Sequence, residues 1–247
     1  MPGATELTIA TLPDTHADRG GGTWIRRNRQ MLAPILFLAP GVLFFLLYVI
    51  FPILESFQIS FFRWDGLGEP QFIGLENYRE LGSDPAFEVS LWNNLKWLVL
   101  YLLAIPGGLF IALFLNQTVA GIRLYKSLFF FPFVISQVVV GLVFTWFYDP
   151  TFGLLNTLLE GVGLGPVNVL GDPRLATYGI ILAGLWPQVA YCMILYLTGL
   201  NAVDPEQVEA ARLDGAKGWR MLWFVILPQL RPATFIAFVV TIIGALR

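Results

Sequence analysis

The amino-acid sequence predicts an all-α membrane protein, a polytopic bundle of transmembrane helices. Of the 247 residues, 56% are hydrophobic and only 13% are charged, whereas soluble domains carry roughly 25% charged residues. The apolar residues are gathered into long runs that polar segments separate. A run of about 20 apolar residues can cross the hydrocarbon core as a helix. We expect about five such helices and assign residues 31–247 to one membrane domain.

Residues 1–30 come before the first apolar run. They are mostly polar, and we predict a disordered cytoplasmic tail because such a segment has little apolar surface to bury. The first span is predicted at 31–54, which has no charged residue. At about 1.5 Å per residue it would be roughly 36 Å long, enough for a core of about 30 Å. Pro34, Pro40 and Pro52 are expected to bend or bound this helix.

The second and third spans are predicted at 92–116 and 125–147. In the second, Pro106-Gly107-Gly108 indicates either a break or a close helix contact. The third contains Pro132 and Gln137. A glutamine at this depth needs a hydrogen-bond partner. An interhelical bond and a contact with a transported solute are both open for Gln137.

The fourth span is predicted at 177–200. Trp186, Gln188 and Tyr191 lie near its middle, where aromatic rings and an amide could bind a sugar ring. Ordinary helix packing is the alternative for these residues. The last span is predicted at 232–247, where fifteen uncharged residues would cover only roughly 22 Å. We therefore expect this last helix to be truncated. A further short helix is expected near Leu154–Leu159, in the loop before the fourth span.

The basic residues predict the orientation of the chain, because cytoplasmic segments of membrane proteins are enriched in lysine and arginine. One set of segments carries Arg19, Arg26, Arg27, Arg29, Arg123, Lys126, Arg212, Lys217, Arg220 and Arg231. The segments on the other side carry only Arg63, Arg79, Lys96 and Arg174. This asymmetry predicts a multi-pass protein of the cytoplasmic (inner) membrane with its N-terminus in the cytoplasm.

Residues 201–231 form the most polar part of the second half of the chain, and they are predicted to be a helix, a turn and a second helix. Asp204 can cap the first helix, with Pro205 at its first position. Gly215 stands where the chain must leave that helix, because glycine adopts the left-handed conformation readily. The second helix is predicted from about Lys217 to Leu227, and Pro228 and Pro232 are expected to stop it.

The motifs of this loop resemble a known family. Glu209-Ala210-Ala211, then Asp214-Gly215-Ala216, then Ile226-Leu227-Pro228 are similar to the EAA loop of permease subunits of bacterial ABC importers. With Asp204-Pro205 ahead and Trp219 inside, the loop resembles the sugar-type branch, typified by maltose and glycerol-phosphate permeases. Lys217 departs from the family pattern, in which a small or hydroxyl residue is common at this position.

The resemblance implies a function for the loop. In the family it is a coupling helix that docks in a groove of a cytoplasmic ATPase. The implied coupling residues here are Glu209, Ala210, Ala211, Asp214, Gly215, Leu227 and Pro228. The resemblance also implies six transmembrane helices, a second permease subunit, an ATPase dimer and an extracytoplasmic solute-binding protein. The solute would be a sugar, an oligosaccharide or glycerol phosphate. Gln137, Gln188 and Tyr191 are the candidate pathway residues.

Several kinds of chemistry are missing from the sequence. It has no G-x-x-x-x-G-K-[ST] phosphate loop, so ATP hydrolysis is expected on a partner chain and no cofactor on this one. His16 is the only histidine and Cys192 the only cysteine, which argues against a metal site or an enzyme. The net charge of −2 argues against nucleic acid as a partner, leaving the lipid bilayer and protein subunits. A stand-alone channel or secondary carrier with a coincidentally similar loop is the alternative. A coupled carrier would usually have charged groups inside its spans.

Overall fold

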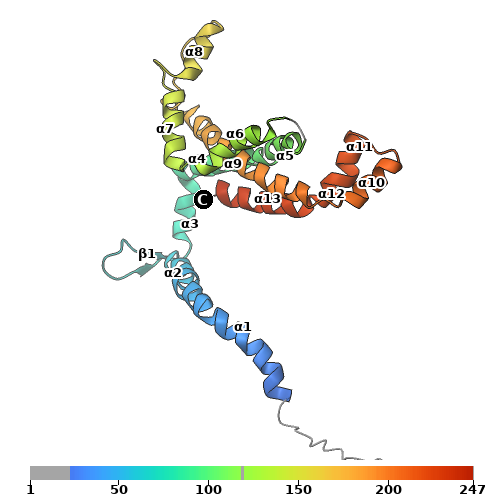
Figure 1. Ribbon diagram of the computed structural model, residues 1–247. Coiled ribbons are helices and arrows are strands. Elements are labelled where there is room, and N and C mark those ends of the chain that lie inside the picture. Colours follow the sequence, from blue (N-terminus) through green and yellow to red (C-terminus); the bar gives the residue numbers. More distant parts are fainter. Residues whose placement is uncertain (1–22, 118–119, 247) are drawn as a thin grey trace, which may run out of the picture. The chain divides into compact units, whose positions relative to one another are not determined.

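The computed structural model describes residues 23–117 and 120–246 (Figure 1). The chain forms two compact units, which are divided between Ser83 and Asp84. Three helices of the described chain are long and apolar enough to cross a membrane, and two bent helix pairs raise this number to five if each pair is one crossing. The predicted helical membrane fold is therefore confirmed.

The first unit contains one long helical run, made of α1 (Thr23–Phe45), η1 (Leu46–Ile50) and α2 (Phe51–Ile59). The candidate span within it is Pro34–Ile59, which ends five residues beyond the predicted limit of 54. The helix begins at Thr23, so part of the predicted disordered tail is helical, and residues 1–22 lie outside the described residues. Pro34 and Pro40 lie inside α1 without ending it. No described residue of the span is buried.

Pro52 does not bound the helix either, because a π-helical turn comes just before it. In this turn the Phe51 N–H donates to the Leu46 carbonyl, five residues back. A π turn is in effect a one-residue insertion into an α-helix, and it changes which carbonyl each N–H meets. Since proline has no N–H to donate, the altered register lets the helix continue through Pro52 to Ile59.

A small folded segment follows α2 in the same unit. Strands β1 (Phe62–Arg63) and β2 (Gln71–Phe72) pair antiparallel, and α3 (Glu76–Ser83) comes next. The Asn77 side chain donates to the carbonyls of Ser60 and Phe62, at 2.8 and 2.9 Å, and so ties α3 to the hairpin. These two short strands are the exception to the predicted all-α fold.

The second unit begins with α4 (Pro85–Tyr101) and α5 (Ala104–Leu115), which together form a candidate span. The Asp84 carboxylate caps α4 by accepting from the Ala86 N–H at 2.8 Å. The helix therefore starts seven residues before the predicted limit of 92. The interruption falls at Leu102–Leu103 and not at the predicted Pro106, which occupies the first turn of α5, where its missing N–H removes no helical hydrogen bond.

The span predicted at 125–147 is two helices, α6 (Ile122–Val134) and α7 (Gln137–Phe147), which meet at an angle of 101°. Pro132 weakens the end of α6 because it cannot bond to the carbonyl four residues back. The Ser136 hydroxyl then starts a new helix by accepting from the Val139 N–H at 3.3 Å. The chain continues into α8 (Leu154–Gly161), which matches the short helix predicted near Leu154–Leu159.

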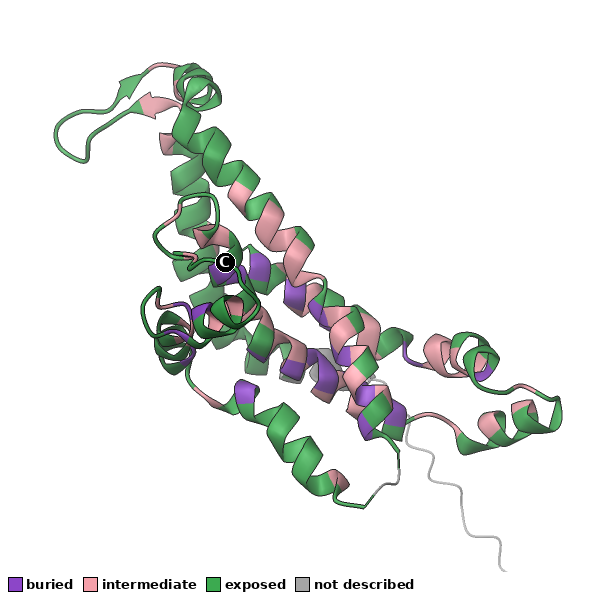
Figure 2. Cartoon of the chain, turned by 90° about the horizontal axis from the view of Figure 1, so that it is seen from above, coloured by how far each residue is buried: buried purple, intermediate pink, exposed green. Residues whose placement is uncertain are grey.

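The core of this unit lies where α5, α9 and α13 pack together, and Figure 2 shows the buried residues gathered along these helices. Helix α9 is Ala176–Asn201 and α13 is Arg231–Ala245, close to the spans predicted at 177–200 and 232–247. The buried residues of the larger cluster are Ala112, Leu115, Met193, Tyr196, Leu200 and Leu230.

Glycine lets α5 and α9 approach closely. A Cβ atom on Gly108 would lie 2.5 Å from Cys192 Cβ and 2.7 Å from the Met193 nitrogen. Neither distance is compatible with a real side chain. The sequence Pro106-Gly107-Gly108 predicts either a break in the helix or a close helix contact. At Gly108 the structure shows the close contact. Small residues that allow backbones to meet are typical of helix contacts inside membranes.

Candidate functional site

The polar loop between α9 and α13 contains four short helical elements. They are α10 (Pro205–Leu213), α11 (Trp219–Met221), η2 (Leu222–Ile226) and α12 (Leu227–Gln229). Figure 1 shows α10 and α11 side by side, at the end of α12 that leads away from α13. The loop is therefore a compact helical hairpin and not an extended connection.

The start of α10 is capped as the sequence predicts. The Asp204 Oδ1 atom accepts from the Glu206 N–H at 2.9 Å, and Pro205 occupies the first turn. The Gln207 side chain donates to the second carboxylate oxygen of Asp204 at 3.0 Å. The bond to Glu206 satisfies a backbone donor that the helix itself leaves free. The negative charge of the Asp204 carboxylate also lies at the positive end of the helix dipole, where it is favourable.

The end of α10 is a Schellman motif around Gly215. The Ala216 N–H donates to the Ala211 carbonyl at 2.9 Å, and the Gly215 N–H donates to the Arg212 carbonyl at 3.1 Å. This geometry needs a residue in the left-handed region, and Gly215 has φ +82°. A Cβ atom on Gly215 would meet no atom within 4 Å. The requirement for glycine in this chain is therefore conformational and not steric.

The second helix of the loop differs from the prediction. It begins at Trp219 and continues through Pro228 to Gln229, and the chain then bends by 70° at Leu230 into α13. Pro228 does not end it because η2 is a π turn, in which the Leu227 N–H donates to the Leu222 carbonyl. The relation of Pro228 to its π turn is the same as that of Pro52.

The predicted coupling residues fall into two groups. Glu209, Ala210, Asp214 and Gly215 are exposed on α10 and its C-cap, and Ala211 beside them is partly buried. Leu227 and Pro228 are partly buried, and Leu227 packs against the core cluster. The structure thus gathers the first group on one helix and places the second at the junction with the membrane core.

The three predicted pathway residues have different surroundings. Gln137 is exposed in the first turn of α7. The Tyr191 ring stacks on Phe133, with ring centroids 5.5 Å apart. The Gln188 amide donates to Thr241 Oγ1 on α13 at 2.9 Å, and Thr241 is fully buried. Gln188 therefore makes an interhelical hydrogen bond.

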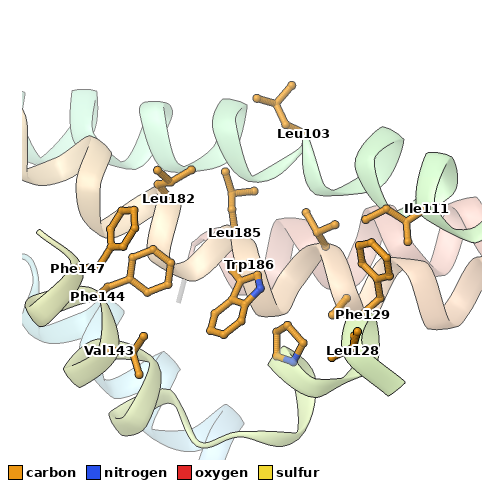
Figure 3. A pocket seen from close by; sticks show the side chains of 13 residues that line it. Leu103, Ile111, Leu128, Phe129, Val143, Phe144, Phe147, Leu182, Leu185 and Trp186 are labelled. Atoms are coloured by element: carbon orange, nitrogen blue, oxygen red, sulfur yellow. The ribbon is translucent and has the colours of Figure 1, made fainter. Parts of the chain in front are cut away.

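A large apolar pocket of about 820 Å³ lies between α5, α6, α7 and α9. Trp186 lies in its middle, with Phe144 and Phe147 on one side and Phe129 on the other (Figure 3). The Trp186 ring meets Phe144 edge to face, with the centroids 5.9 Å apart. The side chains that line this pocket are almost all apolar, so the pocket cannot satisfy the hydroxyl groups of a sugar.

Residues 104–247 match the model of a protein family described as the binding-protein-dependent transport system inner membrane component. The matched region contains α5, α9, α13 and the whole helical hairpin. The chain belongs to this family. It is a permease subunit of an ABC importer, as the motifs Glu209-Ala210-Ala211 and Asp214-Gly215-Ala216 predict.

Individual relatives agree with the family match. A probable ABC transporter permease protein of Pyrococcus horikoshii is 37% identical to the chain over 90% of its length and 78% of the relative. The arabinooligosaccharides transport system permease protein AraP of Bacillus subtilis is 34% identical, with 87% of this chain and 69% of AraP covered. A crystal structure of a bacterial ABC transporter that imports the acidic polysaccharide alginate contains a similar chain, with a TM-score of 0.73 and 25% identity over 90% of this chain and 76% of that one.

The permease also exposes large apolar side chains on the hairpin, and of these only Trp219 belongs to the motifs named from the sequence. Leu213 at the end of α10 is 90% exposed, and Phe224 and Trp219 are 79% and 69% exposed. Large apolar side chains on a polar loop are a usual sign of a protein or lipid contact. The sequence already indicates such a contact, because these bulky apolar residues stand in its most polar segment.

Replacing Gln188 with leucine is expected to lower the stability of the permease by about 0.6 to 1.7 kcal/mol, the range for hydrogen bonds between membrane helices. The physical reason is that buried Thr241 loses the amide donor of Gln188 and keeps on α9 only the weak contact with Cys192 Sγ, at 3.7 Å. Thermal unfolding of the purified protein in detergent measures this change. The control is Gln137→Leu, at an exposed glutamine. Equal loss of stability in both variants would contradict the assignment of a special bond to Gln188.

Proposed function

We propose that this permease moves a sugar or a related solute, such as an oligosaccharide or glycerol phosphate, across the cytoplasmic membrane by alternating access. The observation that carries the proposal is the helix α10, which is capped at both ends and exposes Glu209 and Gly215. The sugar assignment is supported by the similarity to AraP, an arabinooligosaccharide permease, and to the alginate importer. A separate ATPase subunit supplies the energy.

The proposed coupling step follows from the position of α10. An ATPase dimer binds the surface formed by exposed Glu209, Ala210, Asp214 and Gly215 with partly buried Ala211 beside them, and ATP-driven closure of the dimer pulls on α10. Leu227 and Pro228 lie between this surface and α13, and Leu230, at the bend just before α13, is fully buried in the core. The pull is therefore passed to a helix that packs on α9, and the resulting rigid-body motion opens the pathway to the other side.

Two further partners complete the proposed importer. The family description names a binding-protein-dependent system, which supports an extracytoplasmic solute-binding protein. A second permease subunit, identical or different, supplies the other wall of the pathway. The distribution of lysine and arginine supports a cytoplasmic location for the N-terminus and the hairpin, on the side where the ATPase acts.

Within the pathway we propose contacts from Gln137 and Tyr191, because Gln137 is exposed at the start of α7 and Tyr191 is only partly buried. Gln188 joins them if its bond to Thr241 opens during the cycle. The apolar pocket around Trp186 is not the proposed sugar site, because its walls offer hardly any hydrogen-bond partners. A sugar needs a partner for each hydroxyl that it removes from water.

The first experiment tests whether the hairpin docks an ATPase. The permease is co-expressed with the ATPase subunit of a sugar-type ABC importer from the same organism, and co-purification is compared between wild type and Glu209→Lys. We expect the wild type to recover the ATPase and the variant to recover at least tenfold less, because the charge on the docking surface is reversed. Glu160→Lys is the matched control, with the same charge change at an exposed residue of α8.

Two results would overturn the proposal. One is a folded wild-type permease that binds no ATPase. The other is flux of labelled arabinooligosaccharide through liposomes that contain this chain alone, without ATP, which is the behaviour of a channel or secondary carrier. The proposal predicts flux only when the ATPase, the second permease and the binding protein are all present.

A further inference from the structure

We propose that Gln229 is a positioning residue that fixes the orientation of α10 to α12 and, through it, to α13. This inference rests on the proposed coupling role of α10. Gln229 is the last residue of α12 and comes directly before the buried residue Leu230, where the chain bends into α13. Its side chain crosses from this junction to the N-cap residue of α10, Asp204.

The contact is made by both ends of one carboxamide. Gln229 Oε1 accepts from the backbone N–H of Asp204 at 2.9 Å, and Gln229 Nε2 donates to the Val225 carbonyl at 3.1 Å. One end therefore holds the N-cap of α10, and the other holds the π turn η2. Gln229 is itself partly buried, so water competes less with these bonds than at an exposed site.

The acceptor for the backbone N–H of Asp204 lies outside α10, although α10 has a residue that could accept this bond. In a capping box, the third residue of a helix reaches back to the N–H of its own N-cap. Here that third residue is Gln207, but it donates to the Asp204 carboxylate instead. The backbone N–H of Asp204 is bonded by a residue 25 positions further along the chain. A contact that could be local is made between two elements, so the angle of α10 depends on α12.

A second set of bonds continues the connection into the core. The Tyr196 hydroxyl on α9 donates to Thr234 Oγ1 at 3.1 Å, and that hydroxyl donates to the Leu230 carbonyl at 2.9 Å. The bend at Leu230 is thereby held from α9, one residue after Gln229. As long as the hydrogen bond between Gln229 and Asp204 is intact, a displacement of α10 moves α13 and does not merely change the angle of the bend at Leu230.

Hydrogen exchange of the Asp204 amide tests the contact directly. Gln229→Met keeps the length of the side chain but removes both hydrogen bonds. We expect the exchange rate at Asp204 to rise about fivefold, the size expected for one ordinary hydrogen bond. Gln207→Met is the matched control, because it also removes a glutamine that bonds Asp204 but leaves the backbone N–H paired. Equal exchange in the two variants would overturn the proposal.

A second measurement tests transmission in the complex with the ATPase. Spin labels are placed at Glu206 on α10 and Phe235 on α13, both exposed, after replacement of the single cysteine by Cys192→Ser. The non-hydrolysable nucleotide AMP-PNP then drives closure. In the wild type the distance between the labels should stay the same, because α10 and α13 move as one body. In Gln229→Met the distance distribution should at least double in width on nucleotide binding.

An unchanged distribution in Gln229→Met would overturn the positioning role, whatever the stability of the variant. Failure of the proposed function would look different, since the wild-type permease would then recover no ATPase at all. The exchange experiment needs only the permease, so it decides on the contact in either case.

Discussion

Replacement of Gly215 by leucine should reduce the ATPase recovered with the permease by about tenfold or more. Gly215 has φ +82° in the Schellman motif that ends α10, and an L-residue with a side chain is less stable there by about 1–2 kcal/mol. About 1.4 kcal/mol corresponds to a factor of ten in binding. In addition, the new side chain would project from the proposed docking surface, because the space around Gly215 is open. Co-purification and ATP-dependent transport measure the effect.

A second variant separates the two causes. Gly215→Asn introduces a residue that tolerates the left-handed conformation, so the motif should persist and most of the binding should return. Comparable loss in both variants would mean that any side chain is excluded at the docking surface. Normal recovery in Gly215→Leu would contradict the assignment of Gly215 to the coupling loop.

Replacement of Gly108 by alanine is expected to have the largest effect on folding. The new Cβ atom would lie 2.5 Å from Cys192 Cβ and 2.7 Å from the Met193 backbone nitrogen, so α5 and α9 would have to separate. Overpacking of this kind destabilises by typically 1–3 kcal/mol. Thermal unfolding of the purified permease, together with its expression level, measures the loss.

The neighbouring residue provides the control. A Cβ atom on Gly107 would meet only the two methyl groups of Val189, at 3.6 Å, which is an ordinary van der Waals contact. Gly107→Ala should therefore be close to wild type in stability. Similar destabilisation by both substitutions would show that helix propensity or lipid contact, and not the close approach of α5 and α9, determines the result.

The features that could be predicted from the sequence depend on local chemistry. The span at 177–200 became α9 because its apolar run is long and its boundaries are polar. The α10 helix was predicted at both ends, since Asp204-Pro205 and Gly215 each satisfy free backbone groups of the helix itself. Family membership followed from the same residues. Such signals lie within a few positions of one another and need no knowledge of the rest of the fold.

The features that the sequence does not predict depend on contacts between distant residues or on the hydrogen-bond register within a helix. Pro52 is predicted to bend or bound its helix and Pro228 to end its helix, but a π turn ahead of each lets the helix continue. The 101° break after Pro132 was not expected, because neither Ile135 nor Ser136 is a strong helix breaker. The bond from Gln188 to Thr241 joins residues 53 positions apart, so no local pattern could distinguish it from a solute contact.

The π turn η2 has a consequence for any change in the length of the hairpin. An α-helix advances by about 100° per residue, and the extra residue of a π turn rotates everything beyond it by that amount relative to a regular helix. Rewinding the same residues as a regular helix would turn Gln229 and Leu230 by about 100°, away from Asp204 and the core. Removing one residue between Leu222 and Ile226 would also restore a regular helix, but it would keep both residues facing as they do now, because the Leu227 N–H would still bond the Leu222 carbonyl. The π turn thus compensates for one extra residue, and the orientation of Gln229 depends on that compensation.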